Sequence, residues 1–166
     1  MTSLTKRLVP LAVILAACGC SKPAAPPSGS EEEGVQKAFA AFQEAMKAKD
    51  GEKLFGMLDS DSQAEAERAA QAIKDAYAKA APAEKGETEK SLGLSAAELA
   101  ALDAKGYLKS KRFLGKWHEI PGSKYEKATV QGEKATLNYI EDDGDHEKLT
   151  YVKQGGAWKL SIPMPK

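Results

Sequence analysis

The last third of the chain most limits the folds that it can adopt, because apolar and polar residues alternate there along four short segments. The segments are 124–131, 134–141, 146–153 and 157–163, and two to four residues rich in glycine or aspartate separate each from the next. Alternation with a period of two is typical of half-buried strands. Connections this short join antiparallel neighbours. The sequence therefore predicts a four-stranded antiparallel meander with one face packed on other elements and one face partly wet.

The residues before this predicted sheet follow the period of a helix. Along the first of these segments an apolar residue recurs every three or four positions, at Val35, Phe39, Phe42 and Met46. This spacing predicts one buried face on a helix that ends at Asp50-Gly51, and segment 52–58 predicts a second, short helix. Helices followed by an antiparallel sheet define an α+β fold, with N-terminal helices packed on a C-terminal four-stranded meander.

Two capping signatures predict further helix starts. Segments 62–65 and 95–98 both read Ser-x-x-Glu, a pattern in which the serine and glutamate side chains satisfy each other's free backbone amides. The first predicted helix is closed by Pro82, whereas the second runs through Ala104 and stops at Gly106. The apolar stripe of the first is mostly alanine, which predicts close packing against a neighbour, and it comprises Ala66, Ala69, Ile73, Tyr77 and Ala80. The polar segment 83–93 has no assigned structure.

The first 17 residues have the layout of an export signal. Lys6 and Arg7 precede an apolar run of about ten residues that ends on two small alanines. This run is too short to span a bilayer, which takes about 20 apolar residues. The expected division of the chain is a signal over 1–17, a flexible linker over 18–34 that is rich in proline, serine and glycine, and a single domain over 35–166.

The end of this signal, Leu15-Ala16-Ala17-Cys18, resembles the lipobox of bacterial lipoproteins. The resemblance implies cleavage before Cys18, acylation of its sulfur and attachment of the protein to a membrane. Two or three acyl chains hold a protein stably, because each buried methylene adds about 0.8 kcal/mol. The alternative is an uncut secretory signal in which the cysteine occurs by chance.

The residues that follow Cys18 refine this expectation. In Gram-negative lipoproteins an aspartate directly after the lipid cysteine favours the inner membrane, so Gly19 implies the outer membrane if the cell has two. Cys20 lies outside the lipobox register and is either a bystander thiol or a partner in an interchain disulfide. Residues 21–166 contain no further cysteine, so the domain must be stable without internal disulfides.

The charge balance argues against a polyanionic partner. The chain has 24 basic and 24 acidic residues, and removal of the signal leaves 22 basic residues against 24 acidic ones. A protein that binds nucleic acid through phosphate contacts usually carries an excess of positive charge. We therefore expect no nucleic acid partner.

The domain resembles the nuclear transport factor two-like (cystatin-like) superfamily of α+β proteins, in which a curved sheet wraps on helices. The resemblance rests on the early amphipathic helix that ends in "KAKDGEKLFGML" and on the pattern "GGAWKL" at 155–160. Many small bacterial lipoproteins of unknown function end in that pattern. The segment 62–111 departs from the superfamily, which has a strand in this region. Some enzymes of the superfamily place an acidic, histidine or tyrosine side chain in the concave pocket of the sheet.

Candidate functional residues are few. Tyr139, Tyr151 and Trp158 are candidates for the lining of such a cleft, although buried tyrosines more often belong to the core. The two histidines, His118 and His146, fall outside the predicted inner face, and no titratable pair for acid–base catalysis emerges from the pattern. We therefore expect no catalytic residues and no cofactor.

Two charged segments have structural explanations. The acidic segment 141–147 lacks the glycine and glutamate positions of a calcium loop, which favours a solvated turn and predicts no metal site. The basic segment 109–112, followed by Lys116, is either an anionic-surface contact or an ordinary basic helix end.

Two hypotheses for function remain. The favoured one is a non-catalytic envelope lipoprotein that faces the periplasm or the cell surface and binds a small ligand or an envelope protein. The alternative is a small-molecule enzyme, such as an isomerase, cyclase or dehydratase, that uses an apolar cleft. An enclosed cavity with a buried carboxylate or histidine would favour the enzyme, and a filled sheet face would favour binding or scaffolding.

Overall fold

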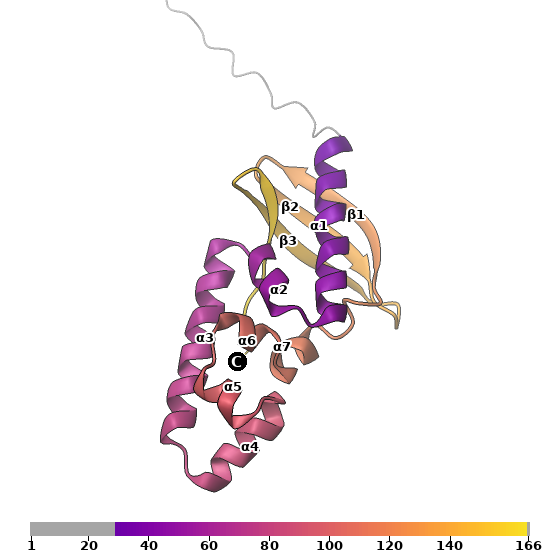
Figure 1. Cartoon of the computed structure of the whole chain (residues 1–166). Helices are drawn as coiled ribbons and strands as arrows, with labels where there is room; N and C mark the ends of the chain where they lie inside the picture. The colour runs from indigo at the N-terminus through magenta and orange to yellow at the C-terminus, as the bar shows by residue number, and fades with distance from the viewer. Residues whose placement is uncertain (1–28, 166) are drawn as a thin grey trace, which may run out of the picture.

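The computed structural model describes residues 29–165 (Figure 1). Within them the chain forms seven helices followed by one sheet of four strands. This arrangement confirms the predicted α+β fold, with helices first and an antiparallel sheet last. Among these residues no helix combines the length and the apolar character that crossing a membrane requires.

The sheet is the predicted meander. Its strands are β1 (Lys124–Gln131), β2 (Lys134–Ile140), β3 (His146–Gln154) and β4 (Ala157–Ser161). They lie in the order β1-β2-β3-β4, and each neighbouring pair is antiparallel. A bulge between Tyr125 and Lys127 interrupts the register of β1 with β2. The alternation in the sequence thus defines both the strands and the face that each side chain occupies.

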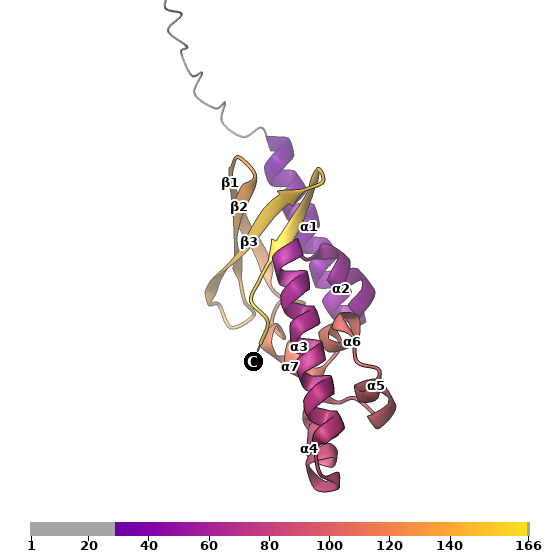
Figure 2. The ribbon, with the colours of Figure 1, turned by 90° about the vertical axis from the view of Figure 1, so that its left-hand side faces the viewer.

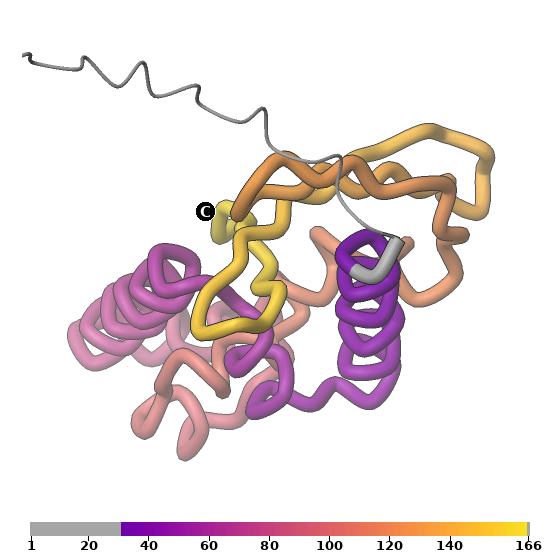
Figure 3. The backbone as a smooth tube through the Cα atoms, turned by 90° about the horizontal axis from the view of Figure 1, so that it is seen from above, coloured from indigo at the N-terminus to yellow at the C-terminus, as the bar shows by residue number. Residues whose placement is uncertain are grey.

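Helix α1 (Gly29–Ala48) lies inside the curve of the sheet, as the view along the molecule shows (Figure 3). The predicted stripe is confirmed, since Val35, Phe39, Phe42 and Met46 are all buried. Facing them are the buried inward positions of the sheet, among them Leu137, Tyr139, Leu149, Tyr151 and Leu160. Burial of apolar surface between α1 and the sheet forms one half of the core.

The start of α1 corrects the predicted linker boundary. The helix begins at Gly29, so residues 29–34 belong to the folded domain and not to the linker predicted over 18–34. Acidic side chains in the first turn suit the positive end of the helix dipole. Glu31 in addition accepts hydrogen bonds from Lys153 Nζ and, at 3.1 Å, from Trp158 Nε1, which ties this turn to β3 and β4.

Helices α2 (Gly51–Met57) and α3 (Ser60–Lys79) carry the chain away from the sheet. The predicted capping box at 62–65 is wrong, because α3 begins earlier and its N-cap is Asp59, whose carboxylate accepts from Ser62 N at 2.8 Å. Ser62 lies within the first turn, and its hydroxyl accepts from the backbone N of Ile162 at 3.0 Å. Both Asp59 and Ser62 are buried, so this joint holds the helices against the end of β4.

The polar segment 83–93, for which the sequence predicts no structure, lies largely in a helix. Residues Pro82–Leu92 are α4, which begins on a proline in its first turn, where a missing N–H costs nothing. It ends at Gly93 in the left-handed conformation, with φ of 66°. Pro82 therefore lies just after the end of α3, as predicted, and it is also the first residue of α4.

Three short helices complete the chain before the sheet. The capping box at Ser95 is confirmed: Glu98 N donates to Ser95 Oγ at 3.3 Å and Ser95 N donates to Glu98 Oε2 at 2.8 Å. Helix α5 covers only Ala96–Ala100, because Asp103 caps a new helix, α6 (Ala104–Leu108). Gly106 lies within α6, so the predicted stop there is wrong. Helix α7 (Lys111–Lys116) follows, capped by Ser110.

The folded part is elongated. The two side views agree that the sheet and the start of α1 lie at one end and the α3–α4 hairpin lies at the other (Figures 1 and 2). The last described residues run back from β4 alongside α3, where Tyr107 donates its hydroxyl to Pro165 O at 2.8 Å. The first described residue of the chain is therefore far from the α3–α4 end.

Candidate functional site

The inner face of the sheet, where the resemblance implies a pocket, is filled by α1. The Phe39 ring packs at 5.7 Å, centroid to centroid, from the ring of Tyr139. Tyr151 is 1% exposed, and among the described residues its hydroxyl has no hydrogen-bond partner. Trp158 is half-buried and donates to Glu31 on α1. Tyr151 and Trp158 therefore contribute to the packing of the sheet on α1.

Tyr139 differs from these two residues, because its hydroxyl reaches a recess at the end of the sheet. The Tyr139 hydroxyl donates to Glu141 Oε1 at 3.3 Å. The recess has a volume of about 270 Å³. We call it the acidic cleft, and its lining includes Trp117, His118, Glu119, Tyr139, Glu141 and Glu147. Three carboxylates from three separate segments meet there.

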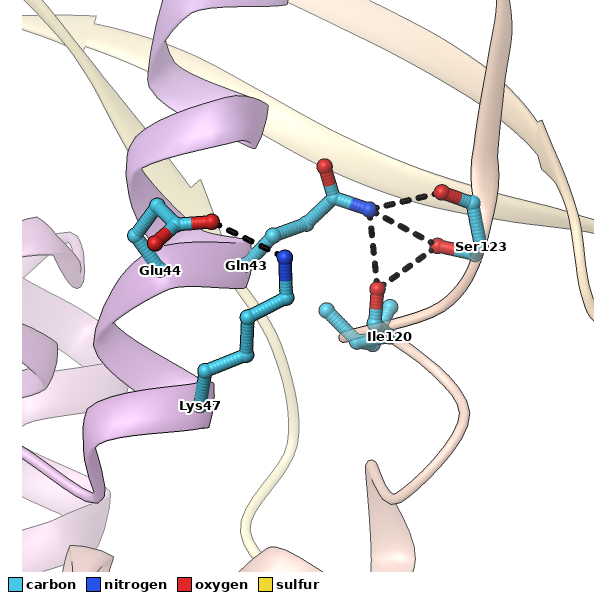
Figure 4. A network of polar contacts seen from close by, with 5 residues as sticks. All are labelled: Gln43, Glu44, Lys47, Ile120 and Ser123. Atoms are coloured by element: carbon cyan, nitrogen blue, oxygen red, sulfur yellow. Dashed lines mark hydrogen bonds and ion pairs between the residues drawn. The ribbon is translucent and has the colours of Figure 1, made fainter.

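The turn after α7 brings Glu119 to the cleft, and Gln43 of α1 holds this turn in place (Figure 4). Gln43 Nε2 donates to Ile120 O at 2.9 Å and to Ser123 O at 2.7 Å. The Ser123 hydroxyl also donates to Ile120 O at 2.9 Å. Because the carbonyl of Ile120 and that of Ser123 are both anchored to one side chain, the segment directly after Glu119 is held against α1.

The opposite wall of the cleft is the β2–β3 connection. Glu141 follows β2, and its backbone N donates to Asp145 O at 2.9 Å across the tight turn. Gly122 lies directly against this connection, since a Cβ placed on it would stand 2.1 Å from Asp142 Oδ2. The atom that it would meet is the end of a flexible side chain, so a larger residue at position 122 would require the Asp142 carboxylate to move. The two loops therefore lie in contact beside the cleft.

A hydrogen bond with Glu119 is the main influence on the pKa of the Glu141 carboxyl group. Together with burial and the negative charge of Glu119, this bond raises the pKa of Glu141 to about 7. Burial is the main cause that raises the pKa of the Tyr139 hydroxyl, and the charges of Glu141 and Glu147 raise it further. With this pKa the Glu141 carboxyl group is partly protonated at neutral pH, since its ionisation beside the Glu119 carboxylate meets like-charge repulsion.

A proton held by a carboxyl pair can be given up and taken back near pH 7, which is the chemical requirement for general acid–base catalysis. The same arrangement can also receive a cationic group in place of the proton. Within residues 29–165 no group of three histidine, cysteine, aspartate or glutamate side chains has the geometry to hold a metal ion. The chemistry that the site offers is therefore proton transfer or binding of a positively charged ligand.

His118 lines the cleft, whereas His146 is not among the residues of its lining. His118 Nε2 stands 3.6 Å from Glu119 Oε1, and its ring is 69% exposed. His146 Nδ1 stands 3.5 Å from Glu126 Oε2 on the neighbouring bulge. The acidic segment 141–147 forms a solvated hairpin turn, as predicted, and its first residue also serves the cleft.

The predicted basic cluster spreads over different neighbours. Lys111 reaches across to α4, where its Nζ donates to Lys90 O at 3.5 Å. Lys116 lies over the ring of Trp117, with its Nζ 5.7 Å from the ring centroid. Lys109 and Arg112 are exposed. The sequence run 109–116 therefore does not act as one contact patch.

Cys18 and Cys20 lie outside the described residues, so the lipid attachment stays a prediction. Comparison of the chain with protein-family models, with curated proteins and with solved structures finds no match. The resemblance to the nuclear transport factor two-like superfamily likewise stays a prediction.

The acidic cleft makes stability depend on pH. Because the pKa of Glu141 is about 7 in the folded protein and 4.5 ordinarily, the folded state binds the proton more tightly than the unfolded state. This stabilisation is complete below about pH 4.5 and is lost as the pH rises through about 7. We expect the free energy of unfolding of the wild type to fall by about 1 kcal/mol between pH 5 and pH 8 because of this pair. The value is modest because solvent screens a partly exposed pair. Urea unfolding at the two pH values measures this loss.

The variant Glu141→Gln should lose less stability than wild type over the same pH interval. Glu133→Gln, at the exposed β1–β2 turn, is the matched control and should keep the wild-type dependence. An unchanged pH dependence in Glu141→Gln would mean that the two carboxyl groups do not interact in solution.

Proposed function

We propose that this chain is a lipid-anchored protein of the bacterial cell envelope and that its folded domain is a non-catalytic binding or scaffolding module. The observation that carries the proposal is the lipobox-like Leu15–Cys18 directly after an apolar run of export-signal length. The anchor would face the periplasm or the cell surface, and the absence of an aspartate after Cys18 favours the outer membrane of a two-membrane cell.

The filled inner face of the sheet supports the binding role over catalysis. Enzymes of the resembling superfamily use that face as a pocket, whereas here α1 occupies it with Val35, Phe39 and Phe42. Fold by itself is a weak guide to function, so this argument concerns the site and not the topology. A ligand or protein partner would then engage another surface of the domain.

The shape of the domain suits a tethered module. The start of α1 and the α3–α4 hairpin lie at opposite ends (Figure 1). A tether of residues 18–28 reaches at most about 40 Å when fully extended. An anchor at Cys18 would therefore leave the α3–α4 end directed away from the membrane and accessible to partners.

Labelling in the native host tests the anchor. Wild-type protein is expected to incorporate radiolabelled palmitate and to begin at residue 18 by mass spectrometry. Cys18→Ala should incorporate none and should retain residues 1–17, because both acylation and cleavage require the cysteine. Cys20→Ala is the matched control and should behave as wild type. Equal labelling of Cys18→Ala, or a wild-type protein that keeps residues 1–17, would refute the proposed anchor.

A second candidate function, a small-molecule enzyme, has one observation in its favour. The Glu141 carboxyl group has a pKa raised to about 7 and lies beside Glu119 and the Tyr139 hydroxyl, which meets the requirement for acid–base chemistry. The cleft is polar, unlike the apolar cleft that the superfamily enzymes suggest. Turnover of a substrate that is lost in Glu141→Gln and kept in Glu133→Gln would favour this candidate.

A further inference from the structure

A long groove follows one side of α3, at the end of the domain opposite to the start of α1. Its larger part has a volume of about 530 Å³ and lies between α3, α4 and α7. A second part of about 280 Å³ continues beside it toward the C-terminal residues Met164 and Pro165. Both parts share Ala72, Ile73 and Arg112 in their lining, so they form one continuous groove. Volumes of about 300–1,000 Å³ are typical of small-ligand sites.

The floor of this groove is apolar and has no covering element among the described residues. The alanine stripe of α3 was predicted to pack closely against a neighbour, but only part of it does. Of its five residues, Ala66 and Tyr77 are buried and Ala69, Ile73 and Ala80 are half-buried, and the neighbouring Ala72 and Ala76 are exposed. Small side chains leave a hollow along α3, and its lining residues on this helix extend from Glu65 to Lys79.

The ends of the groove are held by specific contacts. At one end, Met164 N donates to Glu65 Oε2 at 3.2 Å, and Tyr107 donates to Pro165 O, which fixes the C-terminal residues beside α3. At the other end, the Tyr77 hydroxyl donates to Glu89 Oε1 at 2.6 Å, which joins α3 to α4. These contacts make the groove a feature of the folded domain and not of a loose surface.

The charges along the groove favour an anion. Arg68, Lys79 and Arg112 line it, and none of the three has a hydrogen-bond or ion-pair partner within residues 29–165. The lining also holds two carboxylates, and each accepts one backbone N–H: Glu65 from Met164 and Glu84 from Ala81 at 2.9 Å, so the cations outnumber the acids by three to two. The groove therefore combines an apolar floor with unpartnered cations.

We propose that this groove binds a single-chain anionic amphiphile, with the acyl chain along the apolar side of α3 and the carboxylate or phosphate headgroup at the Arg112 guanidinium. Arg112 is the shared lining residue at the junction of the two parts, and its planar guanidinium suits a bidentate contact with either headgroup. This inference rests on the proposed function, in that it names the ligand class of the binding module.

Photo-cross-linking with the full chain tests the assignment. The acylated protein is placed in nanodiscs of phosphatidylcholine and exposed to a diazirine derivative of dodecanoate, and the labelled peptides are mapped by mass spectrometry. Label should concentrate in the peptides of α3, α4 and α7. Unlabelled dodecanoate and dodecyl phosphate should both compete, and whichever competes better identifies the headgroup. Each methylene added to the competitor should tighten binding about fourfold until the groove is full.

Two exposed positions provide variants that leave the core intact. Arg112→Gln should weaken competition by dodecanoate about tenfold and leave competition by the neutral dodecanol unchanged. Ala76→Trp should abolish the label in the groove by filling it. Lys127→Gln on the exposed face of β1 is the matched control and should label as wild type. Circular dichroism of each variant verifies the fold.

Several outcomes would overturn the assignment. Label spread evenly over the domain, unchanged labelling of Ala76→Trp, or equal competition by dodecanol and dodecanoate would each do so. In a separate reaction, a bifunctional amine-reactive reagent that joins the α3 peptides of two chains would show instead that the groove is an interface between copies. Palmitate at Cys18 is measured separately, so an acylated protein with an unlabelled groove would refute the ligand and leave the anchor standing.

Discussion

Replacing Gly51 with alanine is expected to lower the free energy of unfolding by about 3 kcal/mol. Gly51 begins α2 and is buried against α6, where a Cβ would stand 2.1 Å from the carbonyl oxygen of Lys105. The obstacle is backbone and not a mobile side chain, so α2 and α6 would have to move apart. Urea unfolding of the wild type and the variant, compared at constant m-value, measures the loss.

Gly56 provides the matched control within the same helix. No atom lies within 4 Å of the position that its Cβ would occupy, so Gly56→Ala should stabilise the protein by about 0.5–1 kcal/mol through helix propensity. If Gly51→Ala were as benign as Gly56→Ala, the contact between α2 and α6 would be looser than described.

Replacing Phe42 with alanine is expected to cost about 3–5 kcal/mol, the usual range for a large aromatic residue in a packed core. Phe42 projects from α1 toward the sheet and is 1% exposed. Its removal leaves a cavity that neighbouring side chains fill only in part, because protein interiors are packed as densely as organic crystals. Thermal and urea unfolding both measure the effect.

The control for this variant is Lys37→Ala on the outer side of α1. Lys37 pairs with Glu33 in an exposed ion pair, so its loss should change stability by no more than about 0.5 kcal/mol. A cost below about 1 kcal/mol for Phe42→Ala would indicate an open cleft between α1 and the sheet. That result would restore the enzymatic hypothesis, because the inner face would then be free to hold a substrate.

The acidic cleft illustrates what the sequence pattern does not reveal. The sequence pattern places Glu141 only in a turn and predicts no role for Glu119, because each is an ordinary polar residue in its own segment. Their pairing depends on the Gln43 contacts with Ile120 and Ser123 and on the close approach at Gly122. Such contacts join residues about 20 to 80 positions apart, and no local period encodes them.

The sequence pattern likewise predicts only some of the helices and their boundaries. The helix α4 was unassigned because its residues are polar and have no apolar stripe, yet Pro82 and Gly93 bound it on either side. The capping box at Ser95 was predicted correctly, whereas the one at Ser62 was not, because Asp59 offered an earlier cap. A capping pattern indicates that a helix can start at that residue. Where two possible N-cap residues lie close together, their relative stabilities determine which one begins the helix.

The sequence by itself determined the α+β order of elements, the strands and their antiparallel pairing, and the buried faces of α1 and the sheet. These features follow from local periods and from short connections, which act over a few residues and leave few alternatives. Only the tertiary structure decided which surfaces remain open. The carboxyl pair of the cleft and the unpartnered cations of the groove arise where segments distant in the chain pack together. These contacts depend on several segments at once, so the sequence of any one segment does not predict them.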